Sequence, residues 1–539
     1  MLLGAKINEE RKQYYYSRGY WTDKTVFDMF LQSVKKYPDK IAVVDNKQKL
    51  SYKALYDKVM KFSTGLLKLG IKKGDFISVQ LPNWAENVIA YLSCAKIGAI
   101  YNPIPFNLRE NEIEYVLTLC ESKIYIIPNE FRKFNYLSMA HSISKKINIQ
   151  HVVVVQNTED QLNLNESYLL FDELMNNNEE VIVSNEKVLS DDPLVVIFTS
   201  GTESRPKGVI HTHNTVLFGE RAMKETLNIT ENDAVFMASP ISHATGFLHG
   251  VNLPLIVGAK SVLMERFSGE KALEIMSEEK CTFTMGATPF LYDFLKILNK
   301  NQKKYDLSHF RFFICGGAPI PRHLASESNK IGFKVLAVYG SSESPPHTVS
   351  RLDDEEDLIV SYDGKPLPGI EVKIVDDNRN SLPNGEIGEE ASRGPNVFVG
   401  YLKRPELTEQ YLDNDGWYYS GDLCVLHSNG YLRVVGRKKD IIIRGGQNIS
   451  PIEIENILLT HPKIQNVAIV GVPDDRMGEK ACAFVVPVLG EEFTFNEMIA
   501  FLEKKNVAKY KYPEMLKVVD SLPMTTSGKI QKFMLRNMV

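Results

Sequence analysis

The stretch at residues 198–208, FTSGTESRPKG, carries the residue types that a phosphate-binding loop requires. Gly201 lets the backbone approach a ligand closely, and the amides around it can form an anion-binding nest. Lys207 supplies a compact positive charge that suits a phosphate. Hydroxyl donors are offered by Thr199, Ser200, Thr202 and Ser204. The P-loop spacing G-x-x-x-x-G-K-[ST] is absent, and on its own the stretch is equally compatible with a flexible surface loop.

Two further stretches place a carboxylate where a nucleotide could use it. YGSSES (339–344) follows an apolar run and sets Ser342 beside Glu343; a hydroxyl can contact a phosphate, and a carboxylate can hold Mg²⁺. YSGDL (419–423) places Asp422 after a glycine, where its carboxylate could accept both ribose hydroxyls. Taken singly, a glutamate such as Glu343 is more commonly a surface acid, and Asp422 could instead close an Asx turn.

Two basic stretches lie nearer the C-terminus. GRKKDIIIRGGQNISP (436–451) joins a basic turn to an apolar run and a glycine pair, and alone it is typical of a β-hairpin with solvated lysines. TTSGKIQK (525–532) presents Lys529 directly after a glycine. Alone, this second stretch is typical of a frayed basic tail.

The elements that would position these residues follow an α/β pattern. Short apolar runs rich in β-branched and aromatic residues predict strands, and longer segments with helical spacing of apolar residues lie between them. Strands are predicted at 40–45, 75–81, 193–200, 310–317 and 334–340, and helices at 54–70 and 87–98. Several of these strands end in Gly or Ser, and ligands of open α/β sheets collect at such strand ends.

The pattern changes after Pro368, where short alternating strands are predicted at 371–376 and 430–437. The last hundred or so residues read as a small α+β unit with two capped helices. Ser450 is the expected N-cap of the first helix, with Pro451 at its first position and Glu453 closing a capping box; Thr494 and Glu497 are expected to cap the second. We therefore expect a large N-terminal α/β domain of layered subdomains, residues 1–436, and a small mobile α+β domain, residues 437–539.

Bulk properties limit the partners. A chain of 539 residues is too long for one core, and its 63 Lys and Arg against 67 Asp and Glu leave no broad basic surface for nucleic acid. Six cysteines without a CxxC pair predict neither a zinc site nor a disulfide framework, so a cytoplasmic location is expected. We expect no secretory signal and no integral membrane segment, because no apolar run reaches the roughly 20 residues required. Peripheral membrane contact stays open.

In order and spacing, the five stretches together resemble the adenylate-forming superfamily of acyl-CoA synthetases, firefly-type luciferases and peptide-synthetase adenylation domains. The resemblance covers the chain from about Trp21 to its end. It is strongest toward bacterial short- and medium-chain fatty acyl-CoA synthetases, through SRGPNVFVGYL, GWYYSGDL, KKDIIIRGGQNIS, KYKYPE and TTSGKIQKF.

The resemblance implies an ATP-dependent acid-thiol ligase. Such an enzyme converts a fatty acid into an acyl-adenylate with release of pyrophosphate, and then transfers the acyl group to coenzyme A. ATP, Mg²⁺, coenzyme A and a carboxylic acid are the implied cofactors and partners. An aryl-acid substrate or a carrier-protein thiol as acceptor are the alternatives within this chemistry. A non-catalytic nucleotide or fatty-acid binder is the alternative outside it, and the presence of both Lys529 and Glu343 argues against that reading.

The resemblance also implies roles at matching positions. Residues 199–207 would form the phosphate loop, in which Glu203 replaces the usual threonine and adds a negative charge. Ser342, which replaces a threonine but keeps the hydroxyl, would contact the α-phosphate, and Glu343 would hold Mg²⁺. Lys439 would be the hinge and Lys529 the adenylation lysine. The remaining nucleotide contacts would be Gly317, Ala318, Pro319, Tyr339, Gly340, Ser341, Asp422 and Arg437.

The acid and coenzyme A sites are expected in apolar and glycine-rich segments. PISHATGFLHG (240–250) would form a wall of the acyl pocket, with His243 and Phe247 near the carboxylate, and Gly316 would lie beside the acyl chain. The segment 287–295 would close the far end through Phe290 and Leu291, and Gly445 and Gly446 would line the tunnel for coenzyme A.

Overall fold

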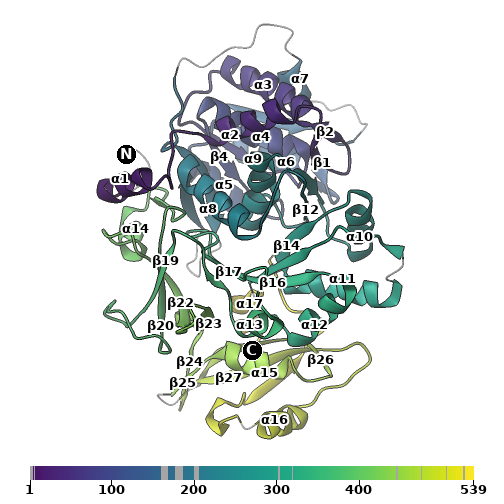
Figure 1. Ribbon diagram of the computed structural model, residues 1–539, viewed down its shortest axis with the longest axis vertical. Helices are drawn as coiled ribbons and strands as arrows, with labels where there is room; N and C mark the ends of the chain where they lie inside the picture. The colour runs from purple at the N-terminus through teal and green to yellow at the C-terminus, as the bar shows by residue number, and fades with distance from the viewer. Residues whose placement is uncertain are drawn as a thin grey trace.

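The computed structural model describes residues 4, 7–158, 168–176, 186–199, 206–301, 304–317, 320–444, 447–474, 476–505, 507–525 and 528–539. In these ranges the chain forms a large body of layered sheets and helices with a smaller lobe at the C-terminal end (Figure 1). The predicted α/β class with a small α+β domain is confirmed.

The first large sheet is parallel from β16 to β1 and has antiparallel strands at both edges. In spatial order its strands are β18 (Lys365–Pro366), β17 (Thr348–Val349), β16 (Lys334–Tyr339), β15 (Phe312–Gly316), β14 (Phe283–Ala287), β12 (Ala234–Met237), β13 (Lys260–Leu263), β1 (Ile41–Val44) and β2 (Lys49–Ser51). The nucleotide motif at 339–344 therefore begins where a parallel strand ends, as expected for ligand sites in open sheets.

The second large sheet is parallel from β10 to β9 and continues through two antiparallel strands. Its order is β21 (Gly400–Tyr401), β11 (Lys207–Thr212), β10 (Pro193–Thr199), β4 (Ile100–Pro103), β3 (Phe76–Val79), β5 (Ile124–Pro128), β8 (His151–Val155) and β9 (Tyr168–Leu170). Strand β10 leads into the phosphate-loop motif, and β11 leads back out of it with Lys207 as its first residue.

Helices cover these sheets and lie between them. They are α1 (Glu9–Ser17), α2 (Val26–Lys36), α3 (Tyr52–Lys68), α4 (Ala85–Ile97), α5 (Glu110–Cys120), α6 (Tyr136–Ser144), α7 (Phe171–Met175), α8 (His213–Thr226), the π-helix η1 (Gly246–Asn252), α9 (Leu253–Val257), α10 (Gly269–Glu278), α11 (Thr288–Asn301), α12 (Arg322–Ile331), α13 (Glu356–Ser361) and α14 (Pro405–Tyr411). A short hairpin of β6 (Glu130–Phe131) and β7 (Phe134–Asn135) precedes α6.

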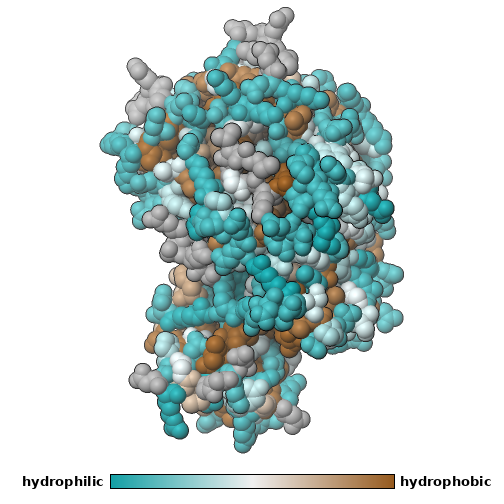
Figure 2. Space-filling view, turned by 90° about the vertical axis from the view of Figure 1, so that its left-hand side faces the viewer, coloured by the Kyte–Doolittle hydropathy of each residue, from teal (hydrophilic) through white to brown (hydrophobic). Residues whose placement is uncertain are grey.

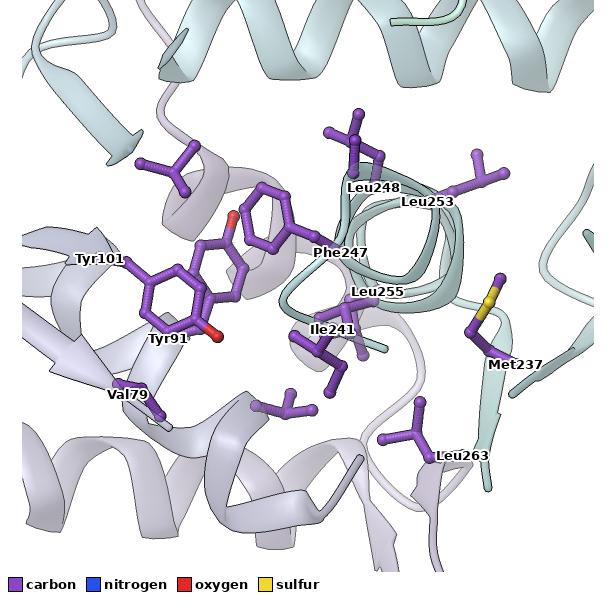
Figure 3. Close-up of a cluster of buried hydrophobic side chains, with 14 of the residues drawn as sticks. Val79, Tyr91, Tyr101, Met237, Ile241, Phe247, Leu248, Leu253, Leu255 and Leu263 are labelled. Atoms are coloured by element: carbon purple, nitrogen blue, oxygen red, sulfur yellow. The ribbon is translucent and has the colours of Figure 1, made fainter. Parts of the chain in front are cut away.

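One hydrophobic core joins the two large sheets. Figure 3 shows side chains of the second sheet, such as Val79 and Tyr101, facing Phe247 of η1, with Met237 and Leu263 of the first sheet on the other side of that helix. The two sheets therefore keep a fixed relation to each other, which fixes the relation between the motifs at their strand ends.

A third, antiparallel sheet closes the large body. Its strands are β19 (Glu371–Val375), β20 (Ile387–Arg393), β22 (Tyr418–Leu426) and β23 (Leu432–Arg437). Ala391 pairs with Tyr419 and Glu389 pairs with Leu423, so residues 420–422 of β22 form a bulge opposite Glu390. A bulge re-aims side chains, and this one carries Asp422.

The C-terminal lobe is built on a sheet that is buried on both faces. It comprises β25 (Gln447–Ile449), β24 (Ile442–Arg444), β27 (Gly478–Pro487), β26 (Ile464–Asp474) and β28 (Met515–Val518), with α15 (Pro451–Leu458), α16 (Phe495–Lys504), η4 (Lys509–Lys511) and α17 (Lys532–Arg536). Along β26, Val467 and Ile469 enter one core while Ala468 and Val470 enter another, as the period of two in a strand requires. The lobe is narrower than the body, and the visible surface of both is mostly hydrophilic (Figure 2).

The two predicted capping boxes have different outcomes. Thr494 and Glu497 exchange side-chain and backbone hydrogen bonds at the start of α16, as predicted. The box at Ser450 and Glu453 is wrong, although α15 begins at Pro451 as expected. The Ser450 hydroxyl donates instead to the Val435 carbonyl of β23, because the helix start packs against the preceding sheet and that carbonyl competes for the donor.

Within the described ranges, no helix combines the length and the apolar character that crossing a bilayer would need.

Candidate active site

The turn at 340–344 is the centre of the candidate site, and neighbouring elements hold its backbone. The Nε2 of His211 on β11 lies 2.7 Å from the Ser342 carbonyl, and the Phe398 amide donates to the Glu343 carbonyl at 2.8 Å. A carbonyl only accepts, so His211 carries its proton on Nε2. Burial lowers the pKa of His211 to about 4, which keeps this ring neutral. The sequence motif is thus fixed by parts of the chain more than 50 residues away.

Glu343 is a buried carboxylate, and Tyr401 is a hydrogen-bond donor to its side chain. The hydroxyl of Tyr401 donates to Glu343 Oε1 at 2.8 Å. Lys207 lies over the rings of Tyr401 and Tyr411, with Nζ 5.6 and 4.7 Å from the ring centroids. Burial, followed by the Glu343 charge, raises the pKa of Tyr401, so it remains a donor. Tyr401 therefore contacts both Glu343, through its hydroxyl, and Lys207, through its ring.

Asp422 connects three elements. Tyr339, the last residue of β16, donates its hydroxyl to Asp422 Oδ2 at 2.7 Å, and Arg437 Nε lies 3.0 Å from Oδ1. Asp422 and Arg437 are opposite each other in the β22–β23 ladder, so the ion pair follows from the strand register. A carboxylate has about four acceptor positions, and two remain for ribose hydroxyls. The predicted ribose set of Asp422 and Arg437 is thus brought together with Tyr339.

Lys529 reaches the same cleft from the C-terminal lobe. Its loop is closed by a hydrogen bond from the Thr525 amide to the Lys529 carbonyl, at 2.8 Å. Gly528 has φ of +84°, and a Cβ there would lie 3.0 Å from the Cβ of Ala287 at the end of β14. Lys529 as a whole residue is exposed and does not belong to the core of the large body, although its charge is partly desolvated by the residues around it. The pKa of Lys529 is lowered to about 8, first by the charge of Arg437 and then by desolvation.

Two carboxylates and the imidazole of His243 complete the electrostatic environment of Lys529. The Asp422 and Glu343 carboxylates raise the pKa of Lys529 but do not offset the cations. Burial and then the Lys529 charge lower the pKa of His243 to about 4, so His243 is neutral at pH 7. Several cations thus crowd a cleft that has too few carboxylates, which favours a polyanionic ligand such as a triphosphate.

The predicted hinge lies between a residue tied to the body and a residue tied to the lobe. Lys438 pairs with Glu389 of β20 at 3.3 Å, whereas Asp440 pairs with Arg536 of α17 at 2.8 Å. Lys439 lies between them in the single turn η3 (Lys438–Asp440). Strand β23 of the body ends at Arg437, and β24 of the lobe begins at Ile442. The chain therefore passes from one domain to the other within a few residues, and the role of Lys439 stays a prediction.

The predicted acyl-pocket residues Phe247 and Gly316 are tightly packed, and their role stays a prediction. Phe247 is fully buried; its ring stacks on Tyr101 with centroids 5.7 Å apart and meets Tyr91 edge-on at 4.8 Å (Figure 3). A Cβ at Gly316 would lie 2.8 Å from Val338 Cγ1, so β15 and β16 pack tightly there. The predicted far-end residues also pack inward: Leu291 is buried, and Phe290 stacks on Phe267 at 4.1 Å.

Several predicted residues lie outside the described part of the chain. They are Ser200, Gly201, Thr202, Glu203 and Ser204 of the phosphate loop, Ala318 and Pro319 of the adenine segment, and Gly445 and Gly446 of the coenzyme A tunnel. Thr199 and Gly317, which precede two of these segments, end β10 and follow β15 as expected.

Sequence reasoning missed the residues that support the motifs. His211 lies in none of the motifs, whereas Tyr401 lies in SRGPNVFVGYL and Tyr418 in GWYYSGDL; these two stretches mark the resemblance but assign no role to either tyrosine. Tyr418 lies 3.4 Å from the Ser341 hydroxyl. These contacts join residues that are 58 to 131 positions apart in the chain, which no local pattern reports.

The residues fit a magnesium ion that is held largely by phosphates. Among the described residues no group of three or more His, Cys, Asp or Glu could hold a metal by itself. Mg²⁺ with a nucleotide typically takes one or two carboxylates, with phosphate oxygens and water as its other ligands. Glu343, which lies within the turn at 340–344 (the nucleotide turn), matches this pattern as a single carboxylate.

The family model described as AMP-binding enzyme matches residues 30–402, and the model described as AMP-binding enzyme C-terminal domain matches residues 453–529. The chain belongs to the AMP-binding enzyme family. The predicted resemblance to adenylate-forming enzymes is therefore confirmed, and the protein is an enzyme of that family.

Relatives and solved structures extend the match over nearly the whole chain. The Medium-chain fatty-acid--CoA ligase of Escherichia coli (strain K12) is 45% identical over 539 residues, covering 99% of this chain and 94% of that protein. The mitochondrial Medium-chain acyl-CoA ligase ACSF2 of Homo sapiens is 33% identical, covering 95% and 87%. ATP-bound MatB from Rhodopseudomonas palustris superposes with a TM-score of 0.86 at 27% identity, covering 96% and 99%. The anthranilate CoA ligase AuaEII, in complex with anthranoyl-AMP, gives 0.87 at 25% identity, covering 96% and 97%.

Replacing Tyr401 with phenylalanine should weaken ATP use selectively. The change removes the donor to the buried Glu343 carboxylate, and a hydrogen bond to a charged group contributes about 1.5–3 kcal/mol. We expect the KM for ATP, at saturating magnesium, to rise about tenfold or more while the KM for the acid changes little. Tyr419→Phe is the control, since Tyr419 donates to Asp413. An unchanged ATP KM in folded Tyr401→Phe would contradict this support role.

The pKa of Lys529 predicts the pH dependence of adenylate formation. The side chain is cationic below about pH 8 and loses its charge as pH rises through that value. Since the cation is the form that stabilises phosphate charge, kcat/KM for ATP should fall above about pH 8. Lys529→Arg keeps its charge and should show no such fall, whatever its overall rate. A decline of the same shape in both proteins would assign the titration to another group.

Proposed function

We propose that the protein is an AMP-forming fatty acyl-CoA ligase for short- and medium-chain acids. The single observation that carries the proposal is the meeting of Lys529, Glu343 and the Asp422–Arg437 pair in one cleft, in a chain that is 45% identical to a medium-chain fatty-acid--CoA ligase over almost its full length.

The residues of this site can both bind the nucleotide and stabilise the charge that develops on its α-phosphate during adenylation. Asp422 and Arg437 would hold the ribose, and Tyr339 would lie against the adenine. A carboxylate oxygen of the acid attacks the α-phosphorus, the bond from that phosphorus to the bridging oxygen breaks, and pyrophosphate leaves. Lys529 and Ser342 would face the charge that builds up on the α-phosphate oxygens. Mg²⁺ held by Glu343 and the phosphates would supply further neutralisation of that charge.

The second half-reaction needs no nucleophile from the protein. The sulfur of coenzyme A attacks the acyl carbon, the bond from that carbon to the AMP oxygen breaks, and AMP leaves. All six cysteines are buried free thiols, and burial raises the pKa of each. None of them suits a covalent intermediate, because the thiolate is the reactive form. Buried free thiols also agree with a cytoplasmic location, which we include in the proposal.

The acid preference is tested with a panel of carboxylic acids. With ATP and coenzyme A, hexanoate and octanoate should give a higher kcat/KM than benzoate or an amino acid. One methylene changes discrimination by only about 1–3 kcal/mol, so the panel should vary smoothly with chain length. A preference for benzoate or anthranilate would replace the fatty-acid assignment with an aryl-acid one. Pyrophosphate release without thioester formation from coenzyme A would point to a carrier-protein thiol as acceptor.

Substitutions of Lys529 and Lys439 should impair different half-reactions. Lys529→Ala should strongly reduce acyl-adenylate formation and largely spare thioester formation from supplied acyl-adenylate and coenzyme A. Lys439→Pro should show the reverse, because fixing φ near −65° restricts the turn that joins body and lobe. Both half-reactions are measured on both variants, with Lys438→Ala as the control that leaves the turn unrestrained. Equal loss of both half-reactions in each variant would refute a domain rotation about Lys439.

A further inference from the structure

A buried charged pair lies directly beneath the nucleotide turn. His347 Nε2 is 3.4 Å from Glu390 Oε1, and both side chains are completely excluded from solvent. His347 follows the turn after β16, whereas Glu390 lies in the middle of β20. Among the described residues neither Glu390 side-chain oxygen makes a regular hydrogen bond, so this ion pair is the contact that offsets the cost of burying the carboxylate.

The contacts of His347 define where its protons are. Its Nδ1 lies 2.9 Å from the Ser344 carbonyl, which can only accept, so Nδ1 carries a hydrogen. Its Nε2 faces a carboxylate oxygen, and two lone pairs would repel each other there, so the pair must hold a second proton between them. Burial lowers the pKa of His347, but the negative charge of Glu390 and the contacts with the Glu390 carboxylate and the Ser344 carbonyl outweigh that effect and raise the pKa overall.

On one side the pair supports the turn that carries Ser342 and Glu343. The Ser344 carbonyl is the point at which this turn closes, because the Ser341 amide also donates to it at 3.3 Å. A Cβ at Gly340 would lie 3.0 Å from the same oxygen, so the turn has little room to open. The ring of His347 also packs edge-on against Tyr339, with centroids 4.8 Å apart.

On the other side the pair supports the bulge that carries Asp422. The Ser420 hydroxyl donates to the backbone carbonyl of Glu390 at 3.0 Å, and the Asp422 amide donates to that hydroxyl at 3.1 Å. The bulge of β22 lies opposite Glu390 in the ladder. A movement of Glu390 would therefore move the carboxylate that pairs with Tyr339 and Arg437.

We propose that the His347–Glu390 pair is a positioning unit that keeps the turn at 340–344 and the bulge at 420–422 in register, so that AMP and ATP bind in one defined geometry. The inference rests on the proposed nucleotide site. Neither residue touches the ligand in this account; both act through Ser344, Tyr339 and Asp422. A pair that only adds stability would leave nucleotide affinity unchanged, and the test separates these roles.

The test is AMP binding to the purified full-length protein by calorimetry, without acid or coenzyme A. Glu390→Leu leaves His347 unpaired and should weaken AMP binding by about tenfold or more. Glu390→Gln should retain affinity within about threefold, because its amide can donate to a neutral Nε2 and preserve the Nδ1 contact with Ser344. The single variants His347→Phe and Glu390→Leu are compared with the double variant that carries both changes. The double variant should bind AMP no more weakly than the single variant with the lower AMP affinity, because the two residues act as one unit.

The matched control is another buried pair of the same type. His249 Nδ1 is 3.2 Å from Glu220 Oε2, with both side chains nearly inaccessible to solvent, and the pair joins η1 to α8 instead of joining the turn at 340–344 to the bulge at 420–422. Glu220→Leu should lower the thermal stability by an amount similar to Glu390→Leu without weakening AMP binding. If Glu390→Leu does not fold, His347→Gln replaces it, since one amide cannot reach both Ser344 and Glu390.

The outcomes also distinguish this inference from the proposed function. Unchanged AMP affinity in folded Glu390→Leu or His347→Gln would overturn the positioning role. Equal loss of AMP affinity in Glu220→Leu would also overturn it, because the effect would then follow stability alone. The wild-type protein's acid-dependent release of pyrophosphate tests the proposed function separately, whichever result the variants give.

Discussion

The ion pair of Asp422 with Arg437, together with the hydroxyl of Tyr339, is the contact on which the arrangement of the site depends. It joins β16 of the first large sheet to β22 and β23 of the third. Arg437 is also the last residue of the body before the η3 turn leads into the C-terminal lobe. The position of this carboxylate therefore relates the nucleotide turn to the segment from which the lobe, with Lys529, extends.

Positive charges are crowded together around Lys529. The charges of Arg437 and Lys439 both lower the pKa of Lys529, and desolvation acts in the same direction. Desolvation, and then the charge of Arg437, lower the pKa of Lys439. Such like-charge crowding is unfavourable by itself, and a bound polyphosphate would relieve it. Part of this positive charge comes from the lobe, through Lys529, and part from the end of β23, through Arg437.

Buried polar groups, rather than the apolar core, decide the local geometry. The core that joins the two large sheets fixes their relation on the scale of whole elements. Within that frame, His211, Tyr401 and His347 each direct a hydrogen-bonding group at the turn that carries Ser342 and Glu343. Directional contacts of this kind are costly to break once buried, so they restrict a short turn to one conformation.

The sequence by itself determined the fold class, the small C-terminal domain and the family. The reason is that strand and helix periodicity, the helix cap at Thr494 and the order of glycine-rich motifs are local properties. It also named Lys207, Glu343, Asp422 and Lys529, because each lies in or directly after a recognisable turn. Only the tertiary structure decided that the Ser450 hydroxyl bonds to Val435 instead of capping α15, because a competing acceptor came from another sheet. Likewise only the fold brought Tyr401, His347 and Glu390 to the nucleotide turn, since strand register and the β22 bulge connect residues that no sequence spacing relates.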